Sequence, residues 1–193
     1  IEEKNKQIVK LNGEDVSITA DFAYEDANVG TDKKVNVTNI ILSGADANNY
    51  KINETTLQTT ASILAKNADN QDIQASLEST QVTYNGKEQK PTVTITDNGT
   101  SLVEGTDYDV QYTDNKNAGT ATVTVTLKGN YLGTKILNFV IEKATLTATY
   151  VSETIEYGET PKLEVKVDNF VNGETAETAE NYVEPKVTAI QLT

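Results

Sequence analysis

The residues of this chain that could do chemistry are carboxylates, lysines, tyrosines and hydroxyls. The 193-residue sequence holds 29 Asp and Glu and nine Tyr, all sixteen of its basic residues are Lys, and it has no His, Cys, Met or Trp. Cysteine nucleophiles, Cys/His zinc sites, histidine bases and arginine phosphate clamps are therefore excluded. Paired carboxylates could hydrolyse glycosides, but acids this frequent form pairs by chance. Small strand-rich units also lack a deep cleft, so we expect no enzyme activity, no catalytic residue and no cofactor.

Calcium binding is a second chemistry to weigh, because acidic and amide side chains cluster at four places. Calcium takes six to eight oxygen ligands, and none of the clusters has the ligand order, glycine and terminal Glu of an EF-hand loop. We therefore expect no metal site, and these clusters are more simply solvated loops. The four clusters are Asp46–Asn49, Asp69–Asp72, Asp107–Asp109 and Asp114–Asn117.

A covalent cross-link is the third possibility. Lys135 or Lys143 together with Asn138 supplies the residue types of a Lys–Asn isopeptide bond beside a carboxylate. The spacing of these residues matches no recognisable pattern, so we do not expect such a bond.

The charge balance narrows the choice of partners. A net charge of −13, with scattered lysines, disfavours nucleic acids and anionic membrane surfaces. The sequence has no apolar run of about 18 residues and no signal-peptide pattern. Since it opens at Ile1 rather than Met, we interpret it as an excerpt of a longer protein. The absence of Cys leaves the compartment open.

A duplicated motif organises the chain. Asn28-Val29-Gly30-Thr31 follows Tyr24-Glu25-Asp26, and Asn117-Ala118-Gly119-Thr120 follows Tyr112-Thr113-Asp114. An alternating apolar and Thr run, and then a Gly…Asn-Tyr pair, follows each copy. Recurrence at a fixed spacing is typical of repeat proteins, whose modules serve reach or multivalent contact more often than catalysis.

Alternating apolar and polar residues predict short strands throughout. Turn residues separate these runs every 8–12 residues or so, as in a small antiparallel sandwich. We therefore predict an all-β chain of tandem Ig-like antiparallel β-sandwich repeats, with β-grasp-like units as the alternative. Only 173–181 tolerates a helix, and an acidic loop is as good an interpretation. The predicted strands are 73–77, 82–84, 91–96, 108–112, 121–127, 136–141 and 146–150.

The motif positions divide the chain into three repeats. Residues 1–66 form a first repeat without its front portion, 67–143 a complete second repeat, and 144–193 a third repeat without its rear portion. The junctions have no Pro-rich or Gly/Ser-rich linker, which favours a semi-rigid array over beads on a flexible string. Incomplete end units would expose strand edges, so strand-edge self-association is a further hypothesis.

Glycines and tyrosines recur at equivalent places in the first two repeats. We expect the glycines to allow turns or bulges with positive φ, rather than to cradle a ligand. Each tyrosine ring should fill the rim of its unit while the hydroxyl reaches a backbone carbonyl, with carbohydrate stacking as the functional alternative. These residues are Gly30, Gly44, Gly119 and Gly129, and Tyr24, Tyr50, Tyr112 and Tyr131.

These motifs carry a family resemblance. The sequence from Asp15 through Asn28-Val29-Gly30-Thr31 to Asn49-Tyr50 resembles the second half of the YDG-type repeats of bacterial surface adhesins. Ile155 through Thr175 is similar to MBG-type repeats, and Tyr84-Asn85-Gly86-Lys87 with Gly129-Asn130-Tyr131 resembles Ig-like stalk repeats of bacterial surface proteins. The resemblance implies secretion and an extracellular place on a bacterial surface, and it supplies no catalytic residue.

From repeat and resemblance together we predict a non-enzymatic stalk or spacer of an adhesin that presents a distal binding region. Two alternatives stay open. One is a module that itself binds a host or neighbouring-cell protein or glycan. The other is an accessory module of a secreted polysaccharide-degrading enzyme.

Overall fold

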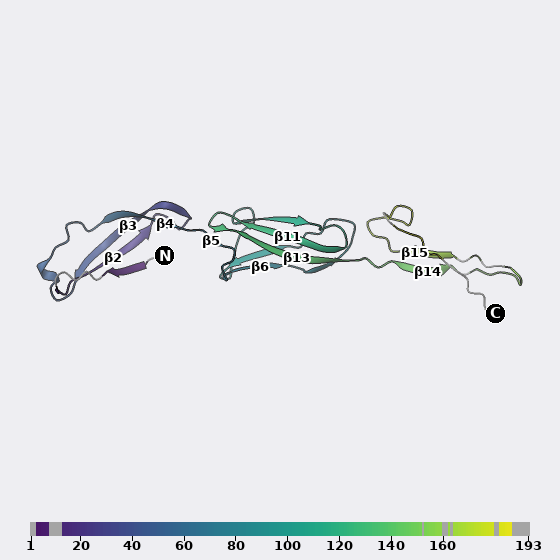
Figure 1. Ribbon diagram of the computed structural model, residues 1–193, viewed down its shortest axis with the longest axis horizontal. Coiled ribbons are helices and arrows are strands. Elements are labelled where there is room, and N and C mark those ends of the chain that lie inside the picture. Colours follow the sequence, from purple (N-terminus) through teal and green to yellow (C-terminus); the bar gives the residue numbers. More distant parts are fainter. Residues whose placement is uncertain are drawn as a thin grey trace. The chain divides into compact units, whose positions relative to one another are not determined.

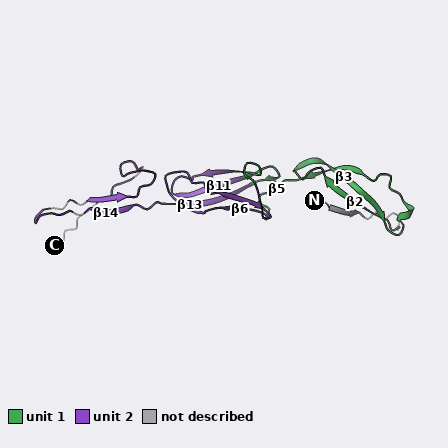
Figure 2. Cartoon of the chain, turned by 180° about the vertical axis from the view of Figure 1, so that it is seen from behind, with its two compact units in different colours: residues 1–71, 103–109, 126–133 green, residues 72–102, 110–125, 134–193 purple. Residues whose placement is uncertain are grey.

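The computed structural model describes residues 3–7, 13–151, 153–159, 162, 164–179 and 182–186 (Figure 1). These residues form β-strands and one short 3-10 turn, so the all-β prediction is confirmed. No helix in the described ranges has the length and apolar character needed to cross a membrane. The chain separates into two compact units, one of residues 1–71, 103–109 and 126–133, and one of residues 72–102, 110–125 and 134–193 (Figure 2). The division into three repeats stays a prediction.

The first unit is built on a four-stranded antiparallel sheet in the order β1-β2-β3-β4. Val35 and Val37 alternate with exposed residues along the long central strand, and they lie with Val16 and Ala20 in the core. This alternation makes one face of the sheet apolar, as the period of two predicts. The strands are β1 (Glu3–Gln7), β2 (Ser17–Tyr24), β3 (Gly30–Ser43) and β4 (Leu57–Ile63).

A tight turn follows β3 and is fastened to the start of β2. Gly44 has a φ of +119°, and the 3-10 turn η1 (Ala47–Asn49) follows it. The Asp46 amide donates to the Asp15 carbonyl at 3.1 Å, and the Asp15 amide donates to the Asp46 carboxylate at 2.8 Å. A Cβ on residue 44 would lie 2.1 Å from the Asp15 carbonyl oxygen, so only glycine fits here.

Positive φ is confirmed at three of the four predicted glycines, namely Gly44, Gly119 and Gly129. Gly30 differs. It lies at an irregularity in the β3–β4 register, as a bulge requires, but Asp32 takes the left-handed conformation with a φ of 52°. The prediction was therefore right about the bulge and wrong about which residue carries the positive φ. Asp tolerates this conformation better than most side chains.

Two further sheets follow, in the orders β6-β8-β9 and β10-β11-β13-β7, together with the short pair β5–β12. Each predicted strand of this region is observed, with bounds that differ by at most two residues from the prediction. The strands are β5 (Lys66–Asn67), β6 (Ile73–Leu77), β7 (Gln81–Thr83), β8 (Val93–Asp97), β9 (Thr100–Ser101), β10 (Tyr108–Thr113), β11 (Gly119–Leu127), β12 (Tyr131–Leu132) and β13 (Thr134–Glu142).

Both larger sheets contribute side chains to a buried core. Phe139 is the largest of the fully buried side chains, with Ile73 and Ile95 from one sheet and Val123 and Val125 from the other. The alternation of Val and Thr along β11 places valines inside and threonines toward solvent. β-branched residues suit such strands on both faces.

The sheets are not purely antiparallel, which corrects the prediction. β7 pairs in parallel with β13, and β5 pairs in parallel with β12. Tyr84 extends the first pairing by donating its amide to the Glu142 carbonyl at 2.8 Å. Local alternation sets which face a residue occupies but carries no information on strand direction, so this pairing could not be inferred from the sequence.

The last described strands form a two-stranded antiparallel sheet, β14 (Thr147–Val151) and β15 (Glu164–Asp168). The stretch that tolerated a helix forms turns over its described residues, up to 179. The Thr178 and Ala179 amides both donate to the Thr175 carbonyl, and the Thr178 hydroxyl accepts from the Thr175 amide. Side-chain bonds of this kind compete with a continuing helix.

Candidate functional site

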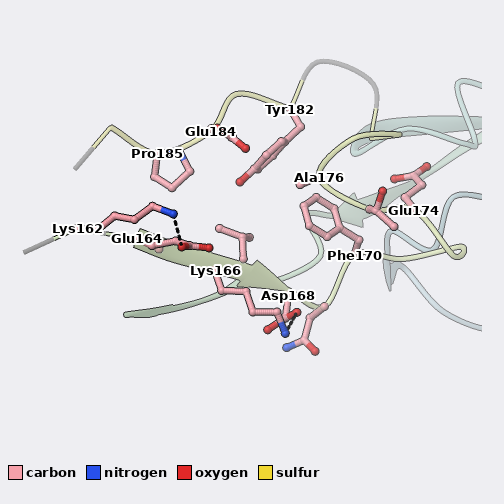
Figure 3. Close-up of a pocket in the computed structure, with 14 residues that line it drawn as sticks. Lys162, Glu164, Lys166, Asp168, Phe170, Glu174, Ala176, Tyr182, Glu184 and Pro185 are labelled. Carbon is pink, nitrogen blue, oxygen red and sulfur yellow. Dashed lines mark ion pairs between the residues drawn. The ribbon is translucent and has the colours of Figure 1, made fainter. Parts of the chain in front are cut away.

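A groove of about 800 Å³ runs along β15 (Figure 3). Lys162, Glu164, Lys166 and Asp168 lie along one wall, and the segment with Tyr182, Glu184 and Pro185 lies across from them. Val165, Val167 and Phe170 add apolar surface. The groove thus combines one face of a two-stranded sheet with a loop and is wide open to solvent.

The charges along β15 pair with one another. The Lys166 ammonium lies 3.1 Å from Asp168, and the Lys162 ammonium lies 3.7 Å from Glu164. All four side chains are largely exposed, so each pair stabilises the fold by only about 0–1 kcal/mol. A catalytic site holds its polar groups in an enclosed, mostly apolar pocket, whereas these ion pairs lie in an open groove. The groove therefore has the character of a surface rather than of a catalytic centre.

The second hollow, of about 520 Å³, is the more aromatic one. Tyr84, Phe170 and Tyr182 line it together with amides and lysines, among them Asn117 and Lys143. The Phe170 and Tyr182 rings meet edge to face, with centroids 5.2 Å apart and planes at 82°. Such a pair is a favourable packing arrangement, and half-buried aromatic rings with neighbouring amides also suit a sugar or a peptide.

The tyrosine prediction is confirmed at Tyr112 and wrong at Tyr50 and Tyr24. The Tyr112 hydroxyl donates to the Pro91 carbonyl at 2.6 Å in a part-buried site. Tyr50 is 39% exposed, and its hydroxyl donates to the Glu14 carboxylate instead of a carbonyl. That hydrogen bond raises the pKa of Tyr50 above its ordinary value. Tyr24 is 41% exposed, so its ring does not fill a rim, whereas Tyr131 is half-buried.

In the cluster Asp107–Asp109, the carboxylates are engaged in local hydrogen bonds and ion pairs. Asp107 accepts the Val103 amide at 2.8 Å, and Asp109 pairs with Lys128 at 2.6 Å. The buried Asn115 amide donates to the Gln89 carbonyl at 2.9 Å. Within the described ranges, no group of three or more Asp or Glu is arranged to hold a metal ion. Asp107 thus stabilises a turn, and Asp109 pairs at the start of β10.

Asn138, the candidate for a cross-link, lies on the exposed face of β13. Its side-chain oxygen accepts the Thr122 hydroxyl at 3.2 Å, across from β11. Lys135 is half-buried and lies on the opposite face of β13 from Asn138. Lys143 is exposed. An exposed amide that bonds a threonine has no buried lysine to react with, so the structure gives this hypothesis no support.

One contact was not predicted from the sequence. It joins the Asn-x-Gly-Thr loop at Asn28 to the Asn-Tyr turn at Asn130. The Val29 amide donates to the Asn130 side-chain oxygen at 2.9 Å, and the Asn130 side-chain nitrogen donates to the Asn28 side-chain oxygen at 3.1 Å. These residues are 101 and 102 positions apart, yet they lie in the same compact unit. The sequence shows that the Asn-x-Gly-Thr motif and the Asn-Tyr pair occur together in each repeat. It does not show which loop contacts which turn.

Comparison with known families gives a match in the first part of the chain. Residues 2–61 match the family model described as the YDG domain. The prediction of a YDG-type repeat is thus confirmed for these residues, which include the first sheet and the Gly44 turn. A search of curated proteins found no match, and neither did a search of solved structures.

Proposed function

We propose that this chain is a non-enzymatic segment of a bacterial cell-surface protein, a stalk or spacer that presents a distal binding region from tandem Ig-like repeats. The observation that carries the proposal is structural repetition. Each copy of the Asn-x-Gly-Thr motif leads directly into a long strand, since β3 begins at Gly30 and β11 begins at Gly119. The strand before each copy also ends within one residue of the same place in the motif, β2 at Tyr24 and β10 at Thr113.

The chemistry of the surface supports the same proposal. The ionisable side chains of the two larger hollows lie in open grooves, and the match at residues 2–61 is to a non-catalytic domain family. Acidic, threonine-rich strand faces with a net charge of −13 keep such a segment soluble at high surface density.

The decisive experiment changes the number of repeats. The full chain is compared with a version in which residues 67–143 are duplicated, and the maximum dimension is measured by small-angle X-ray scattering. A nine-residue strand such as β11 spans about 30 Å, so each added repeat should lengthen a stalk by at least that amount. A compact particle whose longest dimension barely changes would rule out a spacer.

A direct binding role is the second candidate, and the aromatic hollow favours it. Tyr84, Phe170 and Tyr182 could stack on a sugar ring while Asn117 and Asn172 bind its hydroxyls. A glycan array probed with the full chain and with Tyr182→Ala tests this role. Binding that is lost in the variant supports it, and an empty array for the full chain contradicts it.

A further inference from the structure

The loop that carries Asn28 is built to hold two polar atoms at its surface. The Asp26 carboxylate accepts the Asn28 amide at 2.7 Å and forms an ion pair with Lys33. The Glu25 amide donates to the Lys34 carbonyl at 3.1 Å, which closes the base of the loop. The backbone that carries the Val29 amide and the Asn28 side chain is therefore held in position by bonds that do not involve Asn130.

The turn that carries Asn130 is fixed just as firmly. Its base is closed by the bond from the Leu127 amide to the Gly133 carbonyl at 2.9 Å, and the Lys66 amide donates to the Asn130 carbonyl at 3.0 Å. β5 and β12 pair beside it. Because the backbone on both sides is held, ordering this contact costs mainly the rotamer freedom of the Asn130 and Asn28 side chains.

The geometry uses both ends of the Asn130 amide. The side-chain oxygen accepts the Val29 amide, and the side-chain nitrogen donates to the Asn28 oxygen. An aspartate could accept but not donate, and it would place a charge against the Asn28 oxygen. The recognition is therefore specific for an amide side chain of this length.

We propose that the Asn-x-Gly-Thr loop is a recognition site for the asparagine of an Asn-Tyr turn, and that the pair Asn28–Val29 with Asn130 is a clasp that stabilises this part of the chain. The role of this clasp rests on the proposed spacer function, since a spacer needs rigid connections between its parts. The contact itself does not depend on that function. The second loop, Asn117–Thr120, has the same residue pattern and predicts the same specificity.

The chain provides its own matched control. Asn49-Tyr50 stands in the first repeat where Asn130-Tyr131 stands in the second. Asn49 is exposed, and its side chain has no hydrogen-bonding partner among the residues that the structure describes. Replacing Asn49 thus removes the same side chain from the same kind of turn without touching the clasp.

The test is amide hydrogen exchange measured by NMR on the full chain and on N130A, N130D and N49A. The loss of one net hydrogen bond should speed exchange of the Val29 amide about fivefold in N130A. N130D keeps an acceptor for the Val29 amide but cannot donate to Asn28, so its Val29 amide should exchange faster than in the wild type and more slowly than in N130A. N49A should leave the Val29 rate unchanged. Protection of the Val125 amide, deep in the core, reports that each variant is folded.

An unchanged Val29 rate in N130A would overturn the clasp, and so would equal acceleration in N49A, because the effect would then not be specific to the contact. Neither outcome bears on the spacer, which is judged by particle length. Conversely, a compact particle with an intact clasp would remove the spacer function and leave the recognition site standing.

Discussion

Replacing Gly44 by alanine tests how the turn after β3 is fastened to the start of β2. An added Cβ would lie 2.1 Å from the Asp15 carbonyl oxygen and 2.8 Å from its carbon, at a φ of +119°. The side chain cannot move away from backbone atoms, so the turn itself must shift. Three hydrogen bonds depend on this approach, from the Asp46 amide, the Ala45 amide and the Asp15 amide, at 3.1, 3.2 and 2.8 Å.

The cost follows from two contributions. Forcing a non-glycine residue into such a conformation costs about 1–3 kcal/mol. Displacing the turn weakens one or more hydrogen bonds worth about 1 kcal/mol each. We therefore expect Gly44→Ala to lower the free energy of unfolding of the first sheet by about 3 kcal/mol. For a unit of this size that corresponds to roughly 12–24 °C in melting temperature.

Gly129→Ala is the matched control, because the equivalent Cβ would lie 3.6 Å from the Thr106 carbonyl oxygen, an ordinary contact. Its φ of +68° carries only the conformational cost, about 1 kcal/mol. Hydrogen exchange of the Val35 and Val37 amides measures the loss of stability in Gly44→Ala. Exchange of the Val125 amide measures the loss in Gly129→Ala. Equal losses of stability in the two variants would refute the steric argument.

Three further outcomes are expected. Phe139→Ala should destabilise the core by about 3–5 kcal/mol in urea denaturation followed by circular dichroism, because the ring is 1% exposed, whereas Val140→Ala on the other face should cost much less. Tyr112→Phe leaves a carbonyl without its donor and should cost about 1 kcal/mol in the same assay; no loss would contradict the assignment of that hydrogen bond. The ion pair with Lys33 lowers the pKa of Asp26, so its stabilisation is present above the ordinary carboxylate pKa and is lost as pH falls through the lowered value. Acid should therefore speed exchange of the Asn28 amide in the wild type beyond the intrinsic pH effect, and Asp26→Asn should remove that excess.

Much of the local structure could be predicted because it depends on neighbouring residues. Alternation of valine and threonine in β11 sets which side chains are buried, and its strand was predicted to within two residues. Turns could likewise be predicted at the glycines of the motif, because the preference of glycine for positive φ depends on the residue itself. Tyr50 shows the limit. Its place beside a turn could be predicted from the sequence. Its hydroxyl donates to Glu14, 36 positions away, instead of to a backbone carbonyl, and this choice could not be predicted.

By itself the sequence determined the strand class, the repeated motif, the absence of Cys, His and Arg, and the resemblance of the first part of the chain to YDG-type repeats. Only the tertiary structure decided that β7 runs parallel to β13 and that Asn130 binds the loop at Asn28. The physical reason is that periodicity and turn chemistry act over a few residues. Strand direction and loop-to-turn pairing depend instead on where distant segments meet, which is set by the packing of the whole unit.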